Sequence, residues 1–272
     1  QRKHMFNVLK KHKMRNLLVV GLLCATGIAP AHAQDTWKPW DATASLHLER
    51  GNLCSGAIVK FPDSKPTDKA LLLTAGHCLP EGHLEPGKTV SNVSVNSSKN
   101  TAEIHKGKDE DNHMHPKRTG ITKVVYGTMT DTDIAVLETE STYLSLSAAG
   151  IPAREIASDK LSVGDVVSAP SPTLSNPFRG CTISGTGLNK KVSGWSWHNF
   201  VEVSGSACTA LREGGSGAPI ISESDGMIRG VVSMVFDGAN REILGAGPQA
   251  APLLSCINQG TYSADTCRLP RP

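Results

Sequence analysis

The stretch REGGSGAPI, residues 212–220, places one serine among three glycines, with a proline two residues beyond the last glycine. Glycine loses more conformational entropy on folding than any other residue, so three of them are expected where the backbone takes unusual dihedral angles or is approached closely. A serine hydroxyl is a poor nucleophile at neutral pH unless a base accepts its proton and a third group orients that base. The stretch therefore makes Ser216 a candidate nucleophile and directs the search to its partners.

Two other segments supply such partners. LLLTAGHC, residues 71–78, places His77 directly after an apolar run, and DTDIAVLE, residues 131–138, places Asp133 at the start of another. In a serine, histidine and aspartate triad, the histidine is the base and the aspartate holds it in the required tautomer. The backbone N–H groups of Gly214 and Ser216 are candidate donors to a developing oxyanion.

Four short segments, TAGHC, TDIAVL, GGSGAP and GVVSMV, occur in this order and resemble signature segments of the chymotrypsin/trypsin-like serine proteases, with secreted bacterial members the most alike. The second half of the chain is also similar to the protease domain of the HtrA family. The resemblance covers segments of residues 44–256 and implies two orthogonal six-stranded β-barrels with the active site between them. His77 would be general base and then acid, Asp133 would orient it, and Ser216 would attack.

The same resemblance assigns expected roles to further residues. Ser233 matches the family serine that supports the buried aspartate, and Ser233, Met234 and Val235 would form the edge that pairs with the substrate backbone. Ala210 stands at the position that forms the base of the specificity pocket. Because neither Ala210 nor the wall carries a charge there, we expect a small to medium apolar side chain before the scissile bond. A solvated Glu213 at the rim is worth less than burial of an apolar group.

Asp131 competes with Asp133 for the triad. The family pattern has the aspartate immediately before the apolar strand, which favours Asp133 and leaves Asp131 as a solvated turn residue.

Gly215 stands at the position where digestive and clotting members of the family carry an aspartate that pairs with a new N-terminus after activation cleavage. The region before Cys54 also lacks a basic residue followed by Ile-Val-Gly-Gly. We therefore expect the site to form by folding alone.

The N-terminal segment has the pattern of a secretory signal peptide over residues 1–33. A basic stretch precedes an apolar run from Leu17 to Ile28, and Ala31-His32-Ala33 is a cleavage sequence. The apolar run is too short for a permanent membrane span, so no membrane anchor is expected. Removal of six basic residues changes the formal net charge from +3 to −3. We expect a secreted or periplasmic monomer that acts on protein or peptide substrates, with no electrostatic basis for binding nucleic acid.

Six cysteines remain after Cys24 leaves with the signal peptide. An even number of cysteines after a signal peptide predicts disulfides, although six cysteines allow fifteen pairings. None of the six has the C-x-x-C spacing of a metal or redox site. The family resemblance implies the pair Cys54 and Cys78, which braces the histidine loop. Nearness in sequence favours the pairs Cys181 with Cys208 and Cys256 with Cys267.

The mature chain, residues 34–272, is expected to form one all-β protease domain without cofactors. Short runs rich in β-branched and apolar residues alternate with Gly, Pro, Asn, Asp and Ser, as in sandwiches and barrels. A short C-terminal helix is expected around AAPLLSCINQ. The chain from Gly87 onward, and especially the polar stretch 97–120, is expected to be a long surface excursion. The first barrel is predicted at about 44–145, the second at about 160–256, and the link between them within 145–165.

Three other interpretations deserve comparison. GGSGA nearly matches the G-x-S-x-G of α/β-hydrolase esterases, but that fold requires a histidine after the serine and the last histidine is His198. A catalytically silent binding protein on the same fold is the alternative function, although all three triad residues are present. The third is a metal site, for which a charged loop is the simpler interpretation. Its candidate ligands are His105, Asp109, Glu110, Asp111, His113 and His115.

Overall fold

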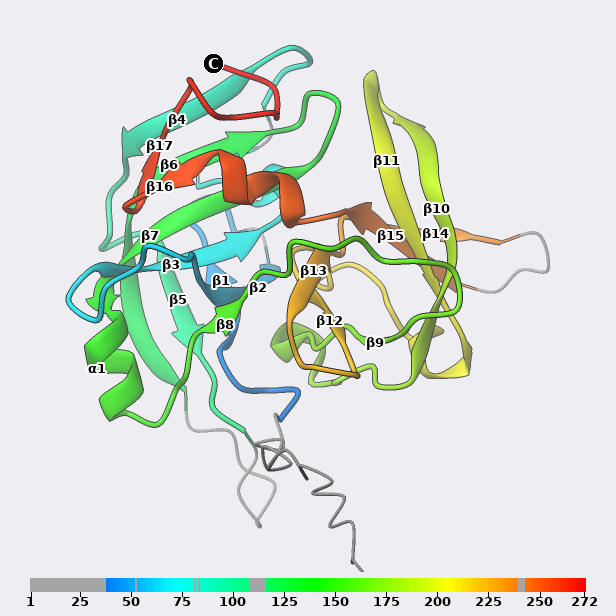
Figure 1. Cartoon of the computed structure of the whole chain (residues 1–272), viewed down its shortest axis with the longest axis horizontal. Coiled ribbons are helices and arrows are strands. Elements are labelled where there is room, and N and C mark those ends of the chain that lie inside the picture. Colours follow the sequence, from blue (N-terminus) through cyan, green and yellow to red (C-terminus); the bar gives the residue numbers. More distant parts are fainter. Residues whose placement is uncertain (1–37, 52, 81, 83, 108–115, 239–242) are drawn as a thin grey trace, which may run out of the picture. The chain divides into compact units, whose positions relative to one another are not determined.

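The computed structural model describes residues 38–51, 53–80, 82, 84–107, 116–238 and 243–272. The predicted signal peptide lies outside the described residues. The regular structure of the described chain is mostly β, in two large sheets and one two-stranded hairpin, with one short α-helix and several 3₁₀ turns (Figure 1). None of the helices in the described ranges is long and apolar enough to cross a lipid bilayer.

The first sheet closes into a six-stranded barrel. Its strands follow the order β1-β5-β6-β7-β3-β2, and β1 pairs with β2 to close the ring. Strand β4 adds to β6, and the short β8 runs parallel to β2. The bounds are β1 (Thr43–His47), β2 (Leu53–Lys60), β3 (Lys69–Thr74), β4 (Thr89–Ser94), β5 (Thr101–Ile104), β6 (Lys117–Thr128), β7 (Ile134–Thr142) and β8 (Arg154–Glu155).

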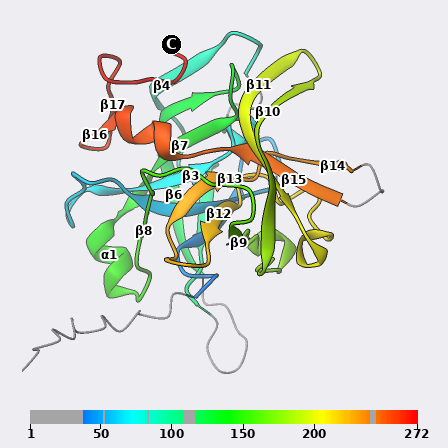
Figure 2. The same cartoon turned by 45° about the vertical axis from the view of Figure 1, so that its right-hand side comes forward.

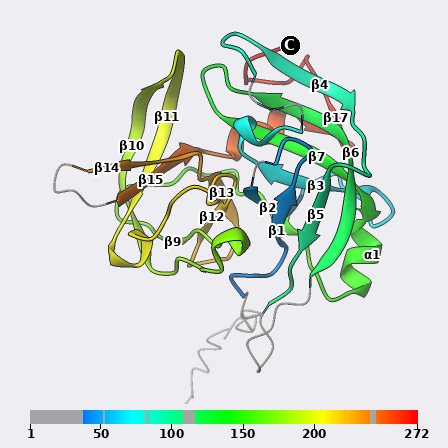
Figure 3. The same ribbon diagram turned by 180° about the vertical axis from the view of Figure 1, so that it is seen from behind.

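The second sheet has the order β13-β12-β9-β10-β11-β15-β14. The chain runs directly from β13, at one end of this order, to β14, at the other end, because only Val232 and Ser233 lie between them. The Ser233 backbone N–H donates to the carbonyl of Ala246 in β15. Figure 3 shows this sheet from behind, beside the first barrel. The bounds are β9 (Val166–Ser168), β10 (Cys181–Val192), β11 (Trp195–Ser204), β12 (Pro219–Ser222), β13 (Ile228–Val231), β14 (Met234–Asp237) and β15 (Ile243–Pro248). The predicted two-barrel, all-β architecture is confirmed.

The C-terminal segment packs against the first barrel. The expected helix is a 3₁₀ turn over Ala251–Ser255, and it is followed by the hairpin β16 (Ile257–Asn258) and β17 (Thr261–Tyr262). Tyr262 stacks on Tyr126 of β6 with ring centroids 5.2 Å apart. Figure 2 shows this segment in orange and red near β4 and β7. The three predicted disulfides are also confirmed, and the third, between Cys256 and Cys267, closes this segment.

One local prediction is wrong. The stretch 97–120 is not simply a surface excursion, because it supplies β5 and the start of β6, and Ala102 and Ile104 of β5 are fully buried. Strand β5 buries alternate residues on one face, which a mostly polar composition conceals. The stretch 145–165, predicted to link the two barrels, lies between β7 and β9. Its first residues belong to a helix, α1 (Tyr143–Ala148), whose start is fixed by reciprocal hydrogen bonds between Thr142 and Ser145.

Candidate active site

Two neighbouring strands of the first barrel bring His77 and Asp133 together. His77 lies in a 3₁₀ turn over Gly76–Cys78 directly after β3, and Asp133 immediately precedes β7. Because β3 and β7 are antiparallel, with Thr74 opposite Ala135, the end of one strand meets the start of the other. The two side chains therefore reach the same edge of the barrel although 56 residues separate them.

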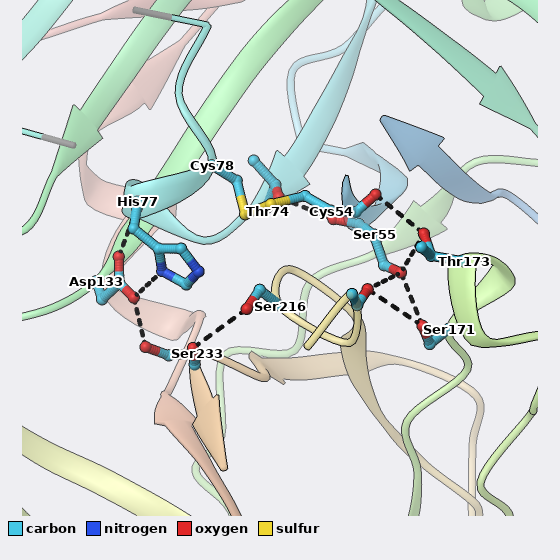
Figure 4. The surroundings of a disulfide bond; sticks show 11 residues. Cys54, Ser55, Thr74, His77, Cys78, Asp133, Ser171, Thr173, Ser216 and Ser233 are labelled. Carbon is cyan, nitrogen blue, oxygen red and sulfur yellow. Dashed lines mark hydrogen bonds and ion pairs between the residues drawn. A yellow bond between two sulfur atoms is a disulfide. The ribbon is translucent and has the colours of Figure 1, made fainter. Parts of the chain in front are cut away.

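Asp133 is fully buried and holds His77 by two hydrogen bonds. The His77 backbone N–H donates to Asp133 Oδ1 at 2.8 Å, and His77 Nδ1 lies 2.7 Å from Asp133 Oδ2. The hydroxyl of Ser233 donates to the same Oδ2 (Figure 4). A buried carboxylate is tolerated when such donors satisfy it. Asp131, in contrast, is exposed and forms none of these bonds.

The carboxylate also changes the acidity of the imidazole. Burial lowers the pKa of His77, but the negative charge of Asp133 and its hydrogen bond outweigh burial, and the pKa is raised above the ordinary histidine value. An imidazole with a raised pKa is a stronger base. His77 is therefore suited to accept a proton from a hydroxyl.

Ser216 lies on the side of the His77 ring that faces away from Asp133 (Figure 4). Its hydroxyl is 3.5 Å from the carbonyl oxygen of Ser233, a long hydrogen bond that leaves it easy to reorient. His77, Ser216 and Gly214 line one cavity of about 600 Å³. His77 and Ser216 thus line one space large enough for part of a ligand, and Asp133 contacts His77.

Gly214, the first glycine of the loop before Ser216, takes a backbone conformation that favours glycine. Gly214 has a φ of +94°, and the N–H of Gly215 donates to the carbonyl of Arg212 at 2.9 Å. A turn with this bond and a positive φ at its third residue is of type II, which glycine adopts without steric cost. This φ sets the orientation of the peptide that carries the Gly214 N–H, one of the two predicted oxyanion donors.

At Gly217, a glycine is required mainly because the backbone closely approaches the first barrel. A Cβ atom at Gly217 would lie 2.0 Å from the carbonyl oxygen of Ser55 and 2.2 Å from the hydroxyl of Thr74. Its φ of +84° is also one that other residues rarely adopt. Only glycine lets the serine loop approach the first barrel this closely. The glycines of REGGSGAPI therefore serve both backbone conformation and close contact.

The predicted substrate-binding residues are not all together. Met234 and Val235 lie on β14, which pairs only with β15 in the described sheet, and Ser233 is beside the triad. Ala210 is exposed and is not among the residues that line the cavity at Ser216, whereas Glu213 is.

Sequence reasoning missed Leu211, the neighbour of Ala210. Its side chain is fully buried, and it lies 3.0 Å from where a Cβ of Gly245 would stand and 3.4 Å from one at Gly215. Leu211 and Val232 belong to one buried hydrophobic cluster, and Val235 packs against this cluster. Its side chain therefore lies between the serine loop and β15. A single leucine beside a predicted pocket residue gives no signal in the sequence that would distinguish it from other core residues.

No sequence pattern indicates the hydroxyl cluster beside the serine loop. The Ser55 hydroxyl contacts those of Ser171 and Thr173, and the hydroxyls of Ser55 and Ser171 both lie within hydrogen-bond distance of the Gly214 carbonyl. Because 116 residues separate Ser55 from Ser171, no local motif joins them.

The structure gives no support to a metal role for the groups near the site. Cys54, His77 and Cys78 lie close together, but the two cysteines are joined in a disulfide and offer no thiolate. Of the six residues considered as metal ligands in the sequence, only His105 is described. It is buried, and its Nε2 lies 3.3 Å from the hydroxyl of Ser45. The five others lie outside the described residues.

Comparison with solved structures finds the same fold at low sequence identity. The apo protease domain of MamO from Magnetospirillum magneticum is 14% identical, with a TM-score of 0.50 over 83% of this chain and 99% of that one. The inactive form of the Rv3671c protease is 16% identical, with a TM-score of 0.47 over 78% and 85%. The HtrA-type protease AlgW with a tripeptide is 18% identical, with a TM-score of 0.45 over 77% and 56%. At such identities the likeness concerns the fold alone.

A comparison with curated proteins gives no match. The family described as "Trypsin-like peptidase domain" matches residues 54–231, which run from the first disulfide through the triad residues to the end of β13. The match covers about two thirds of the sequence and agrees with the two barrels and with the position of the cavity. The chain therefore belongs to the family of trypsin-like peptidase domains.

Proposed function

We propose that the protein is an exported serine endopeptidase in which Ser216 is the nucleophile, His77 the base and Asp133 the residue that orients the base. The observation that carries the proposal is the pair of hydrogen bonds that Asp133 accepts from His77, with His77 and Ser216 lining one cavity. An imidazole fixed at Nδ1 presents Nε2 to a hydroxyl in a defined direction. Three disulfides suit an oxidising compartment outside the cytosol.

The reaction would follow two matched steps. His77 Nε2 takes the proton of the Ser216 hydroxyl while Oγ attacks the scissile carbonyl carbon. The resulting oxyanion accepts hydrogen bonds from the N–H groups of Gly214 and Ser216. Collapse breaks the C–N bond, and the imidazolium gives its proton to the departing amine. Water then repeats the sequence on the acyl-enzyme, and both groups return to their starting states.

Substrate backbone would pair with β14. This strand is the last in its sheet, so one edge has no partner strand among the described residues, and Ser233 connects it directly to the triad. An extended peptide can add to such an edge through main-chain hydrogen bonds. Since the buried Leu211 lies between the serine loop and β15, the strand that pairs with β14, we propose that the side chain before the scissile bond is small and apolar.

The test is hydrolysis of peptide substrates by the mature protein and by Ser216→Ala. We expect cleavage by the wild type and a loss of about 10⁶-fold in kcat for the variant, since attack and proton transfer act as one unit. Equal thermal unfolding midpoints would show that the variant is folded. A wild type that binds peptides without cleaving them would favour the silent binding protein. Cleavage retained in folded Ser216→Ala would refute the assignment of the nucleophile.

A further inference from the structure

A cluster of hydroxyl groups contacts the Gly214 loop. Ser55 and Ser171 are fully buried, whereas Thr173 is partly exposed and also lines the cavity at Ser216. Ser55, in β2, contributes three different groups to this cluster (Figure 4). Its backbone N–H donates to the carbonyl of Ser216 at 2.7 Å, its hydroxyl lies 3.0 Å from the carbonyl oxygen of Gly214, and its own carbonyl accepts from Thr74 at 2.8 Å. One fully buried residue of the first barrel thus contacts the serine loop of the second barrel at two carbonyls.

The protons in this cluster can be assigned because each hydroxyl has only one to donate. Thr173 donates to the carbonyl of Cys54 at 3.2 Å. Leu174 donates its backbone N–H to the Ser171 hydroxyl at 3.3 Å. Ser55 also lies 3.2 Å from the Thr173 hydroxyl, and Ser171 also lies 3.4 Å from the Gly214 carbonyl. The arrangement that uses the shorter contacts has Ser171 donating to the Ser55 hydroxyl at 2.9 Å and Ser55 donating to the Gly214 carbonyl at 3.0 Å. The result is a chain of donors that ends on the backbone of the serine loop.

This chain fixes one peptide plane from both sides. The carbonyl of Gly214 and the N–H of Gly215 belong to the same peptide group. The carbonyl accepts from Ser55, and the N–H donates to Arg212. With this plane held, the remaining freedom of the loop lies in the preceding peptide, whose orientation follows from the positive φ of Gly214.

We infer that Ser55 is a positioning residue, which aims the N–H groups of Gly214 and Ser216 at the developing oxyanion through its two hydrogen bonds to this loop. The inference rests on the proposed function. A glycine stands at 215, so the loop has no carboxylate there to anchor it. The hydroxyl chain supplies a neutral anchor from within the folded barrels. Stabilisation of an oxyanion depends on donors that are held in place before the reaction begins.

The experiment compares Ser55→Ala with the wild type and with Ser168→Ala. Ser168 is a matched control because it is a fully buried serine of the second barrel whose hydroxyl donates to Glu223, not to the serine loop. In steady-state peptide hydrolysis, we expect kcat of Ser55→Ala to fall about 10- to 100-fold with KM changed less than threefold. Ser168→Ala should keep kcat within twofold, even where its thermal midpoint drops by as much as that of Ser55→Ala.

A second measurement does not depend on activity. In protein labelled with ¹⁵N-glycine, amide hydrogen exchange of Gly215 should be at least tenfold faster in Ser55→Ala, while exchange of Gly127 in β6 stays the same. If Ser55→Ala does not fold, Ser171→Ala breaks the same chain one step earlier and should shift both readouts in the same direction. If the wild type cleaves nothing, the proposed function fails and the exchange rate alone decides the role of Ser55. An unchanged Gly215 exchange rate, or a kcat within twofold of an active wild type, overturns the inference.

Discussion

Asp133 holds His77 at two points, through Oδ1 to the backbone N–H at 2.8 Å and through Oδ2 to Nδ1 at 2.7 Å. The first bond fixes the backbone of the histidine turn, and the second fixes the rotation and tautomer of the ring. A substitution at Asp133 therefore acts on position and on proton affinity together.

Asp133→Asn separates these effects from gross unfolding because the amide has nearly the shape of the carboxylate. We expect kcat to fall by about 10⁴, the size of loss that the corresponding change causes in other triads. Single-turnover kinetics with an activated ester would measure the acylation step itself. Retention of more than a tenth of the wild-type rate would contradict the orienting role.

The pH dependence follows from the raised pKa of His77. Only the neutral imidazole can accept the serine proton, so kcat/KM should fall as the pH drops through a midpoint above about 6.5, the ordinary histidine value. In Asp133→Asn the two causes that raise the pKa are removed and burial remains, so the midpoint of the residual activity should move to lower pH. Rate profiles from pH 4 to 9 would show this, and a midpoint that does not move would count against the assignment of His77 as the base.

Leu211 should control the size of the accepted side chain. Leu211→Ala removes a buried side chain next to Gly245 and opens space beside β15. We expect the ratio of kcat/KM for substrates with Phe or Leu before the scissile bond to that for Ala to rise about tenfold or more, since each buried methylene is worth about 0.8 kcal/mol. Ala210→Ser, at the exposed neighbouring position, serves as the control and should leave the ratio unchanged. An unaltered ratio in folded Leu211→Ala would exclude this pocket.

The disulfide between Cys54 and Cys78 joins the histidine turn to β2 and spans 24 residues. Closure of such a loop restricts the unfolded chain, and Cys54→Ala with Cys78→Ala should lower the free energy of unfolding by about 3 kcal/mol. Urea titration followed by tryptophan fluorescence measures the difference. A loss below about 1 kcal/mol would show that the bond contributes little to stability.

The three residues of the proposed triad could be identified from the sequence because each lies in a short segment whose composition is unusual. Ser216 sits among glycines, and His77 and Asp133 flank apolar strands. Strand β5 could not be predicted, since its buried residues alternate with polar ones in a charged stretch. The hydrogen bond between Ser55 and Gly214 could not be predicted either, because the two residues are 159 positions apart and a serine after a cysteine has no distinctive pattern. Such contacts depend on how the two barrels meet.

The most direct test of the central claim is to trap the acyl-enzyme. The mature protein is mixed with a slowly deacylating ester of a small apolar amino acid, quenched in acid, and analysed by intact mass and peptide mapping. We predict one acyl group per molecule of the wild type, located on Ser216. The adduct should be absent from Ser216→Ala and strongly reduced in His77→Ala. Turnover of the ester without any adduct on Ser216, or an adduct on another residue, would contradict this prediction.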